Sequence, residues 1–369
     1  MSLIKVKGKG AENLGRRNLI INGAMQVAQR GTSATGVTNN GSHFIIDRFK
    51  TVINNAYTNT VEQSTDVPSG YGFVYSLKQT FTTAVSSPSS GDYNVLDQNL
   101  EKQNIYSTEN GTSSAKSITL SFWVKSSVTG TFAVTLQNYG SARRSNVLSY
   151  TISSANTWEK KIIVTTADTS ANTSSANGAG LGIRFALGAG SGYEASNATT
   201  GWQTADYFGF TGATYPAATT NATWQVTGVQ LEVGDTATDF EHRSEGEELA
   251  LCQRYCYQHM EANGGTSGGN STEDIVCTAS CYSGTTAYGI IQMPVTMRVA
   301  PTLESHGGTN YWKFYNNSGV GLFNTFAMIN ATRTSVQIYN NQHIGITAGQ
   351  SGNFQGGNTG NYIRLIAEL

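Results

Sequence analysis

The sequence predicts an all-β fold in which a large jelly-roll β-sandwich is joined through a short connecting α-helix to a second, smaller C-terminal β-sandwich domain. Composition is the first observation behind this prediction. Only 13% of the residues are charged and 41 of 369 are glycine, while Ser, Thr and Asn are abundant, as in strands with hydroxyl-bearing outer faces and tight turns. The second observation is that apolar residues alternate in many short runs, which is the two-residue period of strands with one buried face.

Length and charge limit the class of protein. A chain of 369 residues can build two or three domains with hydrophobic cores. Its 23 basic and 24 acidic residues give a formal net charge of -1, so no overall field attracts nucleic acid or an anionic membrane. No run approaches the roughly 20 apolar residues of a membrane span, and the start lacks the apolar segment of a signal peptide. We therefore expect no nucleic-acid partner, no membrane insertion, and synthesis in a cytoplasm.

Residues 1–17 form a locally basic N-terminal arm. Against one acidic residue, Glu12, the arm carries five basic residues and hence a local charge of +4: Lys5, Lys7, Lys9, Arg16 and Arg17. A solvated flexible arm is one interpretation, and an arm that docks on a larger assembly is the other. If the chain belongs to a larger particle, we expect it to attach through this arm.

The first β domain is predicted over residues 18–243. Apolar residues recur at every second position in five runs, at 118–124, 132–136, 148–152, 162–164 and 181–187. Thr129 and Gly130 form a turn between the first two runs, which predicts a hairpin with one buried face. The spacing of the runs, with no recurring repeat unit, favours a jelly roll over a propeller.

The domain closes on a strand whose alternation changes phase. Trp224 and Val226 follow one phase, and Val229 and Leu231 follow the other. This pattern predicts a buried strand with one extra residue, a β-bulge, near Gly228.

Two segments instead have the spacing of helices. Apolar residues after Ser244 are three and four positions apart, at Leu249, Cys252 and Cys256, which predicts a connecting amphipathic helix over residues 244–260. Ser244 and the glutamate three residues later have the spacing of a capping box. If three copies of the chain associate, this helix is too short to hold them together by itself. A second short helix fits residues 92–107, with Val95, Leu96, Asn99 and Leu100 on one side.

A Gly/Ser/Asn-rich linker is predicted over residues 261–273, followed by a C-terminal β domain over residues 274–369. This second domain contains about seven strand candidates separated by turn residues. Ile363, Leu365 and Ala367 share one face of the last candidate, so we expect the final residues to lie inside a sheet.

The four cysteines occur as two pairs with three residues inside each pair: Cys252, Cys256, Cys277 and Cys281. Buried unpaired thiols are one interpretation, and one or two disulfides that join the helix to the following strand are another. A zinc site is a third interpretation, although zinc knuckles usually have two residues between their cysteines. We expect no metal and no cofactor, and the spacing leaves the cysteine connectivity open.

Several stretches resemble the framework of bacteriophage tail-fibre and receptor-binding proteins. The opening stretch is NLIINGAMQVAQRGTS, and the closing and most specific stretch is WQVTGVQLEVGDTATDFEHRSEGEELALCQRY. The similarity spans about residues 17–257. It implies a homotrimer and a domain similar to jelly-roll carbohydrate-binding modules. The calcium ligands of many such modules are not evident here, so the resemblance does not imply calcium.

Glycan binding requires flat aromatic faces beside hydrogen-bonding side chains. Long loops on rigid sheets often carry binding sites, and the loop at residues 189–210 supplies three candidates: Tyr193, Trp202 and Tyr207. The C-terminal domain supplies four more: Tyr311, Trp312, Tyr315 and Asn316. Core packing is the alternative for each aromatic residue. Trp123 and Trp224 lie in strongly alternating strands and are expected in the core or an interface.

Catalytic motifs give no support for an enzyme. The sequence has no nucleophile elbow, zinc-protease motif, P-loop or dinucleotide fingerprint. A polysaccharide depolymerase would need two carboxylates flanking a glycosidic bond, for which Asp92 with Asp97 or Glu194 with Asp206 are the candidate pairs.

We therefore expect a virion protein, active outside cells, that adsorbs to host polysaccharide or lipopolysaccharide and contacts other virion proteins through its N-terminus. A purely architectural fibre or decoration protein is the first alternative, and the depolymerase is the second.

Overall fold

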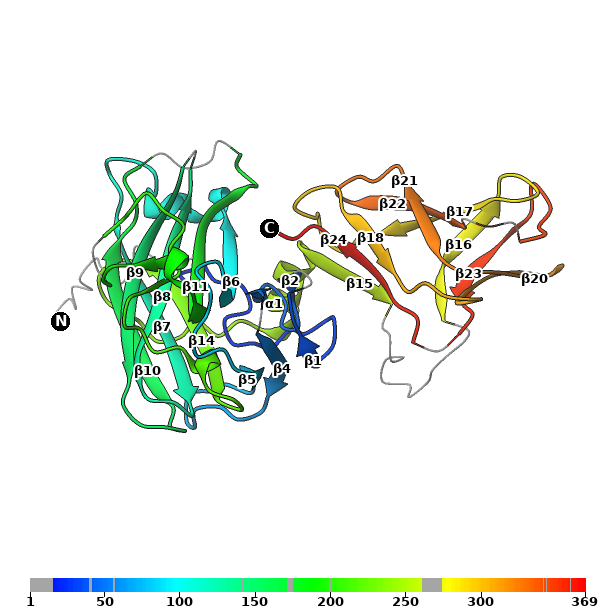
Figure 1. Cartoon of the computed structure of the whole chain (residues 1–369). Coiled ribbons are helices and arrows are strands. Elements are labelled where there is room, and N and C mark those ends of the chain that lie inside the picture. Colours follow the sequence, from blue (N-terminus) through cyan, green and yellow to red (C-terminus); the bar gives the residue numbers. More distant parts are fainter. Residues whose placement is uncertain are drawn as a thin grey trace, which may run out of the picture. The chain divides into compact units, whose positions relative to one another are not determined.

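The computed structural model describes residues 16–39, 42–55, 57–140, 142–170, 175–198, 201–260, 274–340, 342, 344–358 and 360–369. Most of the basic arm predicted at 1–17, and the whole linker predicted at 261–273, lie outside these residues. The chain divides into two compact units (Figure 1), one reaching Glu248 and including Leu369, and the other spanning Leu249–Glu368. Each unit is described by itself. Within the described residues no helix is long and apolar enough to cross a membrane.

Unit 1 contains two six-stranded sheets. The order of the first is β1 (Ser33–Val37), β4 (Thr58–Ser64), β5 (Ser76–Thr83), β14 (Thr223–Val233), β7 (Ser117–Ser126) and β10 (Glu159–Thr166). The order of the second is β2 (Ser42–His43), β3 (Lys50–Asn54), β6 (Tyr93–Glu101), β11 (Ala179–Ala189), β8 (Gly130–Tyr139) and β9 (Arg143–Ile152). All neighbours in both sheets are antiparallel.

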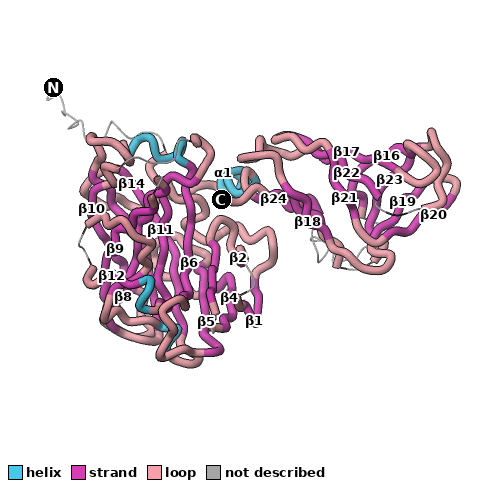
Figure 2. The backbone as a smooth tube through the Cα atoms, turned by 45° about the horizontal axis from the view of Figure 1, so that its top comes forward, coloured by secondary structure: helices cyan, strands magenta, loops and turns pink. Residues whose placement is uncertain are grey.

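The connections of unit 1 confirm the predicted jelly roll. From β6 onward the chain crosses repeatedly between the two sheets, and only the β8–β9 hairpin stays within one. Figure 2 shows how completely strands dominate. The remaining elements of the unit are short: η2 (Lys102–Thr108), η3 (Ser191–Tyr193), η4 (Pro216–Ala218), and the parallel pair of β12 (Glu194–Ala195) with β13 (Gly209–Phe210).

Aromatic side chains fill the centre of unit 1. Phe122 lies edge-on to Phe185 and Tyr150, with ring centroids 5.0 and 5.1 Å apart. The indole of Trp224 donates a hydrogen bond to the Tyr150 hydroxyl at 3.2 Å, so its polar atom is satisfied inside the core. The predicted bulge is also present, because the pairing of β14 with β7 shifts register around Gly228.

The segment at residues 92–107 is not the short helix that its spacing suggested. It forms strand β6 and then η2. Almost every residue of β6 is buried, since one of its faces lies on the core and the other is covered by the loop after β11. A strand that is buried on both faces loses its alternation, and its apolar spacing then imitates a helix.

The connecting helix is shorter than predicted. Helix α1 covers Glu245–Gln253 and begins with the expected capping box, in which Ser244 N–H donates to Glu247 Oε2 at 3.1 Å. Cys256 instead begins strand β15 (Cys256–Met260), which pairs with β24 (Ile363–Ile366). The prediction of a helix through Met260 is therefore wrong, because a partner strand far along the chain overrides the local spacing.

Unit 2 is the smaller β-sandwich. Its three-stranded sheet has the order β15, β24 and β18 (Thr302–Ser305). Its seven-stranded sheet has the order β20 (Gly319–Phe323), β19 (Trp312–Asn316), β23 (Ser351–Gly356), β16 (Ile275–Cys281), β17 (Ala287–Gln292), β22 (Ser335–Asn340) and β21 (Phe326–Ile329). One apolar core joins the two sheets and includes Trp312, Phe354, Ile363 and Leu365. The last strand thus lies inside a sheet, as predicted.

Candidate functional site

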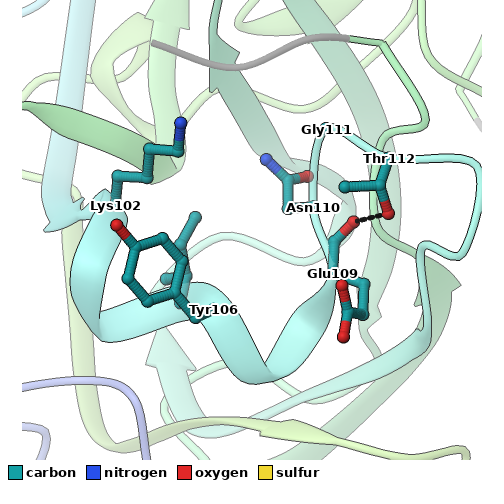
Figure 3. A pocket seen from close by; sticks show the side chains of 7 residues that line it. Lys102, Tyr106, Glu109, Asn110, Gly111 and Thr112 are labelled. Carbon is teal, nitrogen blue, oxygen red and sulfur yellow. Dashed lines mark hydrogen bonds between the residues drawn. The ribbon is translucent and has the colours of Figure 1, made fainter. Parts of the chain in front are cut away.

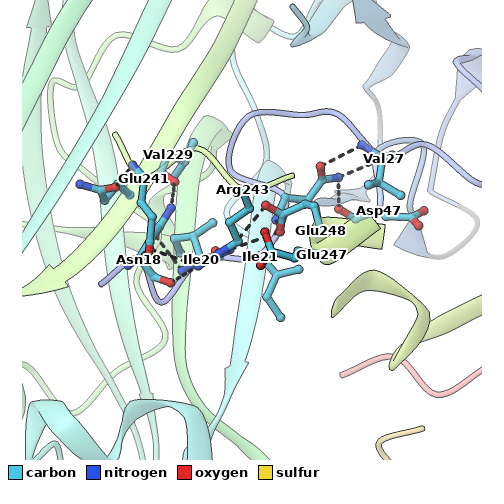
Figure 4. Close-up of polar contacts among 12 residues, drawn as sticks. Asn18, Ile20, Ile21, Val27, Asp47, Val229, Glu241, Arg243, Glu247 and Glu248 are labelled. Carbon is cyan, nitrogen blue, oxygen red and sulfur yellow. Dashed lines mark hydrogen bonds and ion pairs between the residues drawn. The ribbon is translucent and has the colours of Figure 1, made fainter. Parts of the chain in front are cut away.

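The stretches that carry the family resemblance form a structural clasp (Figure 4). Arg243 donates to the carbonyl oxygen of Ile20 at 2.9 Å and to that of Asn18, and it forms an ion pair with Glu248 at 3.3 Å. Glu248 in turn accepts the backbone N–H of Asn22 at 2.6 Å. The opening and closing stretches therefore hold the two ends of unit 1 together through Arg243 and Glu248.

The loop at 189–210 folds back on its own domain. Tyr193 stacks on Phe208, with centroids 4.5 Å apart and planes 6° apart. Trp202 donates its indole N–H to the carbonyl oxygen of Thr166 at 2.9 Å and packs against the main core. Tyr207 packs against the same apolar cluster as Tyr193, over the outer face of the sheet that contains β6, β8 and β11. The three predicted side chains are half-buried and do not form one open platform.

The carboxylates of the candidate catalytic pairs also have structural partners. Asp97 and Asp206 both bind the guanidinium of Arg184, at 3.2 and 3.3 Å. Glu194 accepts the hydroxyl of Tyr215 at 2.8 Å. Asp92 accepts hydrogen bonds from the Asn55 side chain and the backbone of Ser89, at 2.6 and 2.8 Å.

The structure separates the four candidates of the C-terminal domain. Trp312 is 0% exposed and belongs to the core of unit 2, so its assignment to glycan binding is wrong. Tyr311 stacks on His306 at 4.1 Å. Tyr315 is 50% exposed on the outer face of the seven-stranded sheet. Asn316, the next residue, is held by Gln350, whose side-chain oxygen accepts its amide at 3.1 Å.

None of the four cysteines forms a disulfide, and three of them are buried: Cys252, Cys256 and Cys281. The possible disulfides are therefore not formed. Cys252 lies in α1 and Cys256 in β15, whereas Cys277 and Cys281 lie on one strand, β16. Within the described residues, no group of three or more His, Cys, Asp and Glu side chains is placed to hold a metal ion.

An open pocket lies on the sheet opposite the 189–210 loop, and we call it the aromatic pocket. Its volume is about 340 Å³. Its walls come from the loop before β5, strands β7 and β10, the bulge of β14 and the loop before α1: Gly70, Tyr71, Phe73, Ser121, Trp123, Lys160, Gly228, Asp239, Phe240 and His242.

Two rings form the exposed wall of the aromatic pocket. Tyr71 is 53% exposed, and its ring centroid lies 4.3 Å from that of Trp123 with the planes tilted by 47°. Trp123 projects outward because its neighbours on β7, Phe122 and Val124, point into the core. The ring of His242 hydrogen bonds to the backbone carbonyl of Tyr71 at 2.9 Å, which holds the loop that carries this tyrosine.

A second set of rings forms the inner wall of the aromatic pocket. Phe73 lies edge-on to Phe240 at 5.0 Å and 5.1 Å from His242. Gly228 sits beneath Phe73 with φ 62°, and a Cβ atom at this position would lie 2.5 Å from the Phe73 ring. The bulge therefore creates the space that the Phe73 ring occupies.

Polar side chains complete the aromatic pocket. Lys160 and Asp239 are both exposed on its rim and form no ion pair with each other, and Ser121 lies buried at the sheet surface. A carboxylate accepts hydrogen bonds and an ammonium donates them. The aromatic pocket thus offers aromatic faces together with both kinds of hydrogen-bonding group.

A second pocket of about 280 Å³ lies beside η2 (Figure 3). Its wall contains a single aromatic residue, Tyr106, which is 57% exposed, together with Lys102 and Glu109. Thr112 closes one side by donating to the carbonyl oxygen of Glu109 at 2.8 Å. This pocket offers one ring, whereas Tyr71 and Trp123 together form a wall of two rings in the aromatic pocket. We therefore favour the aromatic pocket as the candidate binding site.

Sequence reasoning missed this site although it contained one signal. Trp123 falls between two core residues of an alternating strand, and its phase therefore points outward. Tyr71 lies in a glycine-flanked loop whose place in the fold the local sequence does not reveal.

No protein-family model matches the sequence, and no curated protein matches it. Among solved structures, the enzymatically active domain of tailspike protein 4 of bacteriophage CBA120 is 15% identical, with a TM-score of 0.32, over 59% of this chain and 21% of that chain. A putative sugar-binding protein from Bacteroides thetaiotaomicron is 13% identical, with a TM-score of 0.32, over 59% of this chain and 100% of that chain. A family 11 carbohydrate-binding module from Clostridium thermocellum, in complex with a mixed-linked tetrasaccharide, is 9% identical, with a TM-score of 0.27, over 57% of this chain and 99% of that chain. The chain thus spans about a fifth of the tailspike domain, and similarity at these values assigns no function.

Proposed function

We propose that this chain is a fibre or receptor-binding component of a phage virion that adsorbs to host surface glycans and binds them without cleavage. The observation that carries the proposal is the aromatic pocket, where the rings of Tyr71 and Trp123 stand beside Lys160 and Asp239. The apolar face of a sugar ring stacks on such rings, while its hydroxyls pair with the charged side chains.

The virion assignment is supported by the family resemblance of residues 17–257, and by the low charge of the whole chain. In this proposal the N-terminal arm contacts other virion proteins, three copies form a homotrimer, and the particle is released into the medium. Three copies present three aromatic pockets to one cell surface. Weak binding by each pocket then adds up to strong adsorption.

The test is binding of the full-length chain to an array of purified bacterial surface polysaccharides and lipopolysaccharides. We expect Tyr71→Ala and Trp123→Ala each to weaken binding by about tenfold, since loss of one stacking face removes roughly 1 to 1.5 kcal/mol. Tyr106→Ala is the matched control, because it removes an equally exposed tyrosine from the other pocket. It should bind as the wild type does.

Three other outcomes would contradict the proposal. Equal binding by all variants would exclude the aromatic pocket as the binding site. Failure of the wild type to bind any glycan on the array would favour a purely architectural virion protein. Release of reducing ends from a bound polysaccharide would favour a depolymerase.

A further inference from the structure

Unit 2 leaves many large apolar side chains in contact with solvent, and they lie on the outer face of its seven-stranded sheet. The five aliphatic ones are 43% to 62% exposed: Ile275, Ile290, Val320, Leu322 and Ile329. Monomeric proteins rarely expose contiguous apolar surface of this kind, and such patches mark interaction sites.

Strand register places three of these side chains, Val320, Ile290 and Ile329, in one row across the sheet, together with Tyr315 and three polar residues. Val320 pairs with Tyr315, Tyr315 with Asn353, and Asn353 with Thr278. On the other side of the sheet, Ile290 pairs with Gln337, and Gln337 with Ile329. The pairing of Ala279 with Gly289 aligns Thr278 with Ile290, so the two halves join into one row that we call the outer row.

Three tyrosines lie beside the outer row, of which Tyr282 is exposed and the other two are half-buried. Tyr282 and Tyr288 contact each other edge-on at 5.7 Å, and Tyr288 lies 5.6 Å from Tyr339. Tyrosine is enriched in protein interfaces, because it buries a large rigid surface and keeps a hydroxyl for hydrogen bonding.

The face around the outer row carries almost no charge. Within the seven strands of this sheet, Lys313 is the one charged residue. The outer face of unit 1 carries more charge. Two of its strands, β7 and β10, already present Lys125 and Lys160 there. Identical copies that meet through the face of unit 2 therefore bring few like charges together, so no opposite charge on a partner is needed.

The chemistry of the outer row favours a protein surface over a glycan as its occupant. Its three aliphatic members, Val320, Ile290 and Ile329, offer a sugar neither a flat ring nor a hydrogen bond, whereas they pack well against other aliphatic side chains. Its tyrosine and polar members can contact either kind of partner. The row spans seven strands, or roughly 29 Å, and strands of about five residues are roughly 17 Å long. The product of these two lengths is a flat sheet area of about 500 Å². This area is more than half of the roughly 800 Å² that each partner buries in a standard interface.

We propose that copies of this chain associate with one another through the outer face of the seven-stranded sheet, with the outer row at the centre of the contact. The inference adds to the proposed function by naming the surface through which the copies of the homotrimer contact one another. It rests on that function only for the number of copies.

Sedimentation velocity of the full-length chain over a wide concentration range tests the inference. The wild type should sediment as an oligomer. Ile290→Lys and Val320→Lys, which place a charge in the outer row, should weaken self-association by at least about tenfold. Ile162→Lys is the matched control, since Ile162 is a similarly exposed aliphatic residue on the outer face of β10 in unit 1, and it should remain oligomeric.

The circular dichroism spectrum should be unchanged in the lysine variants, because the replaced side chains are more than half exposed within one chain. A wild type that stays monomeric at every concentration would overturn the inference, as would lysine variants that associate like the wild type. A monomeric wild type whose polysaccharide binding is lost on Ile290→Lys would show that the face binds glycan instead. Glycan binding that depends on Trp123 is measured separately, so failure of the contact surface and failure of the proposed function remain distinguishable.

Discussion

Gly228→Ala tests the link between the bulge of β14 and the aromatic pocket. Gly228 has φ 62°, where a residue with a Cβ atom costs roughly 1 to 2 kcal/mol. The new Cβ would also lie 2.5 Å from the Phe73 ring, which is buried against Phe240 and His242. Displacing a packed ring costs about 1 to 3 kcal/mol. The expected loss of unfolding free energy is therefore about 2 to 5 kcal/mol, the sum of the two costs.

Gly36→Ala separates the two contributions. Gly36 has nearly the same backbone angle, φ 66°, but a Cβ atom there would meet nothing within 4 Å. Its loss should therefore be only the roughly 1 to 2 kcal/mol of backbone strain. The difference between the two variants measures the collision with Phe73.

Urea unfolding followed by tryptophan fluorescence is the suitable assay. Four of the five tryptophans lie in unit 1 and report mainly on that unit: Trp123, Trp158, Trp202 and Trp224. Gly228→Ala should also weaken glycan binding, because Phe73 is part of the pocket wall, whereas Gly36→Ala should not. Equal stability losses in the two variants, or unchanged glycan binding by Gly228→Ala, would refute this account of the bulge.

Three further predictions concern side chains that hold the fold. Arg243→Ala should lower the unfolding free energy by about 3 to 5 kcal/mol in urea titrations, because it leaves buried Glu248 without its counter-ion. The control is Lys78→Ala, which removes a more exposed ion pair and should lower the unfolding free energy by less than about 1 kcal/mol. Burial lowers the pKa of His259 despite its hydrogen bond to a backbone carbonyl. The imidazole is therefore protonated more readily in the unfolded chain than in the native one, and the unfolding free energy should fall as the pH drops below about 6.5. In thermal unfolding between about pH 7.5 and pH 5, this fall should be smaller in His259→Gln, which does not titrate. Partial burial raises the pKa of the Cys277 thiol to about 12, so native protein should react slowly with a thiol reagent at pH 8, and rapid labelling of Cys277 without unfolding would contradict this raised pKa.

The sequence motif and the candidate site overlap in unit 1, because the closing stretch supplies Gly228, Asp239, Phe240 and His242 to the aromatic pocket. Asn18, Asn22, Arg243 and Glu248 belong to the stretches that resemble phage receptor-binding proteins, and they join the two ends of the unit. The motif thus joins the ends of the fold and also forms part of the wall of the aromatic pocket. Binding is assigned to side chains such as Tyr71 and Trp123, which lie on the surface that this clasp stabilises.

Local sequence predicts an element correctly when the element has one buried face. Strand β7 alternates because one face lies on the core and the other meets solvent. Strand β6 is buried on both faces, so its apolar residues do not alternate, and reasoning from periodicity wrongly predicted a helix there. Cys256 followed the helical spacing of α1 but entered strand β15, because its partner β24 lies more than a hundred residues further along the chain.

The sequence by itself determined the all-β class, the jelly roll, the bulge at Gly228, the start of α1 and the final strand, since these follow from periodicity and turn chemistry within a few residues. Only the tertiary structure decided which aromatic residues are open. Trp312 lies in the core, Tyr193 and Trp202 fold back onto their own domain, and Tyr71 of the loop before β5 contacts Trp123 of β7. The physical reason is that strand pairing in antiparallel sheets joins residues far apart in the chain, so the makeup of a surface depends on register and not on local sequence.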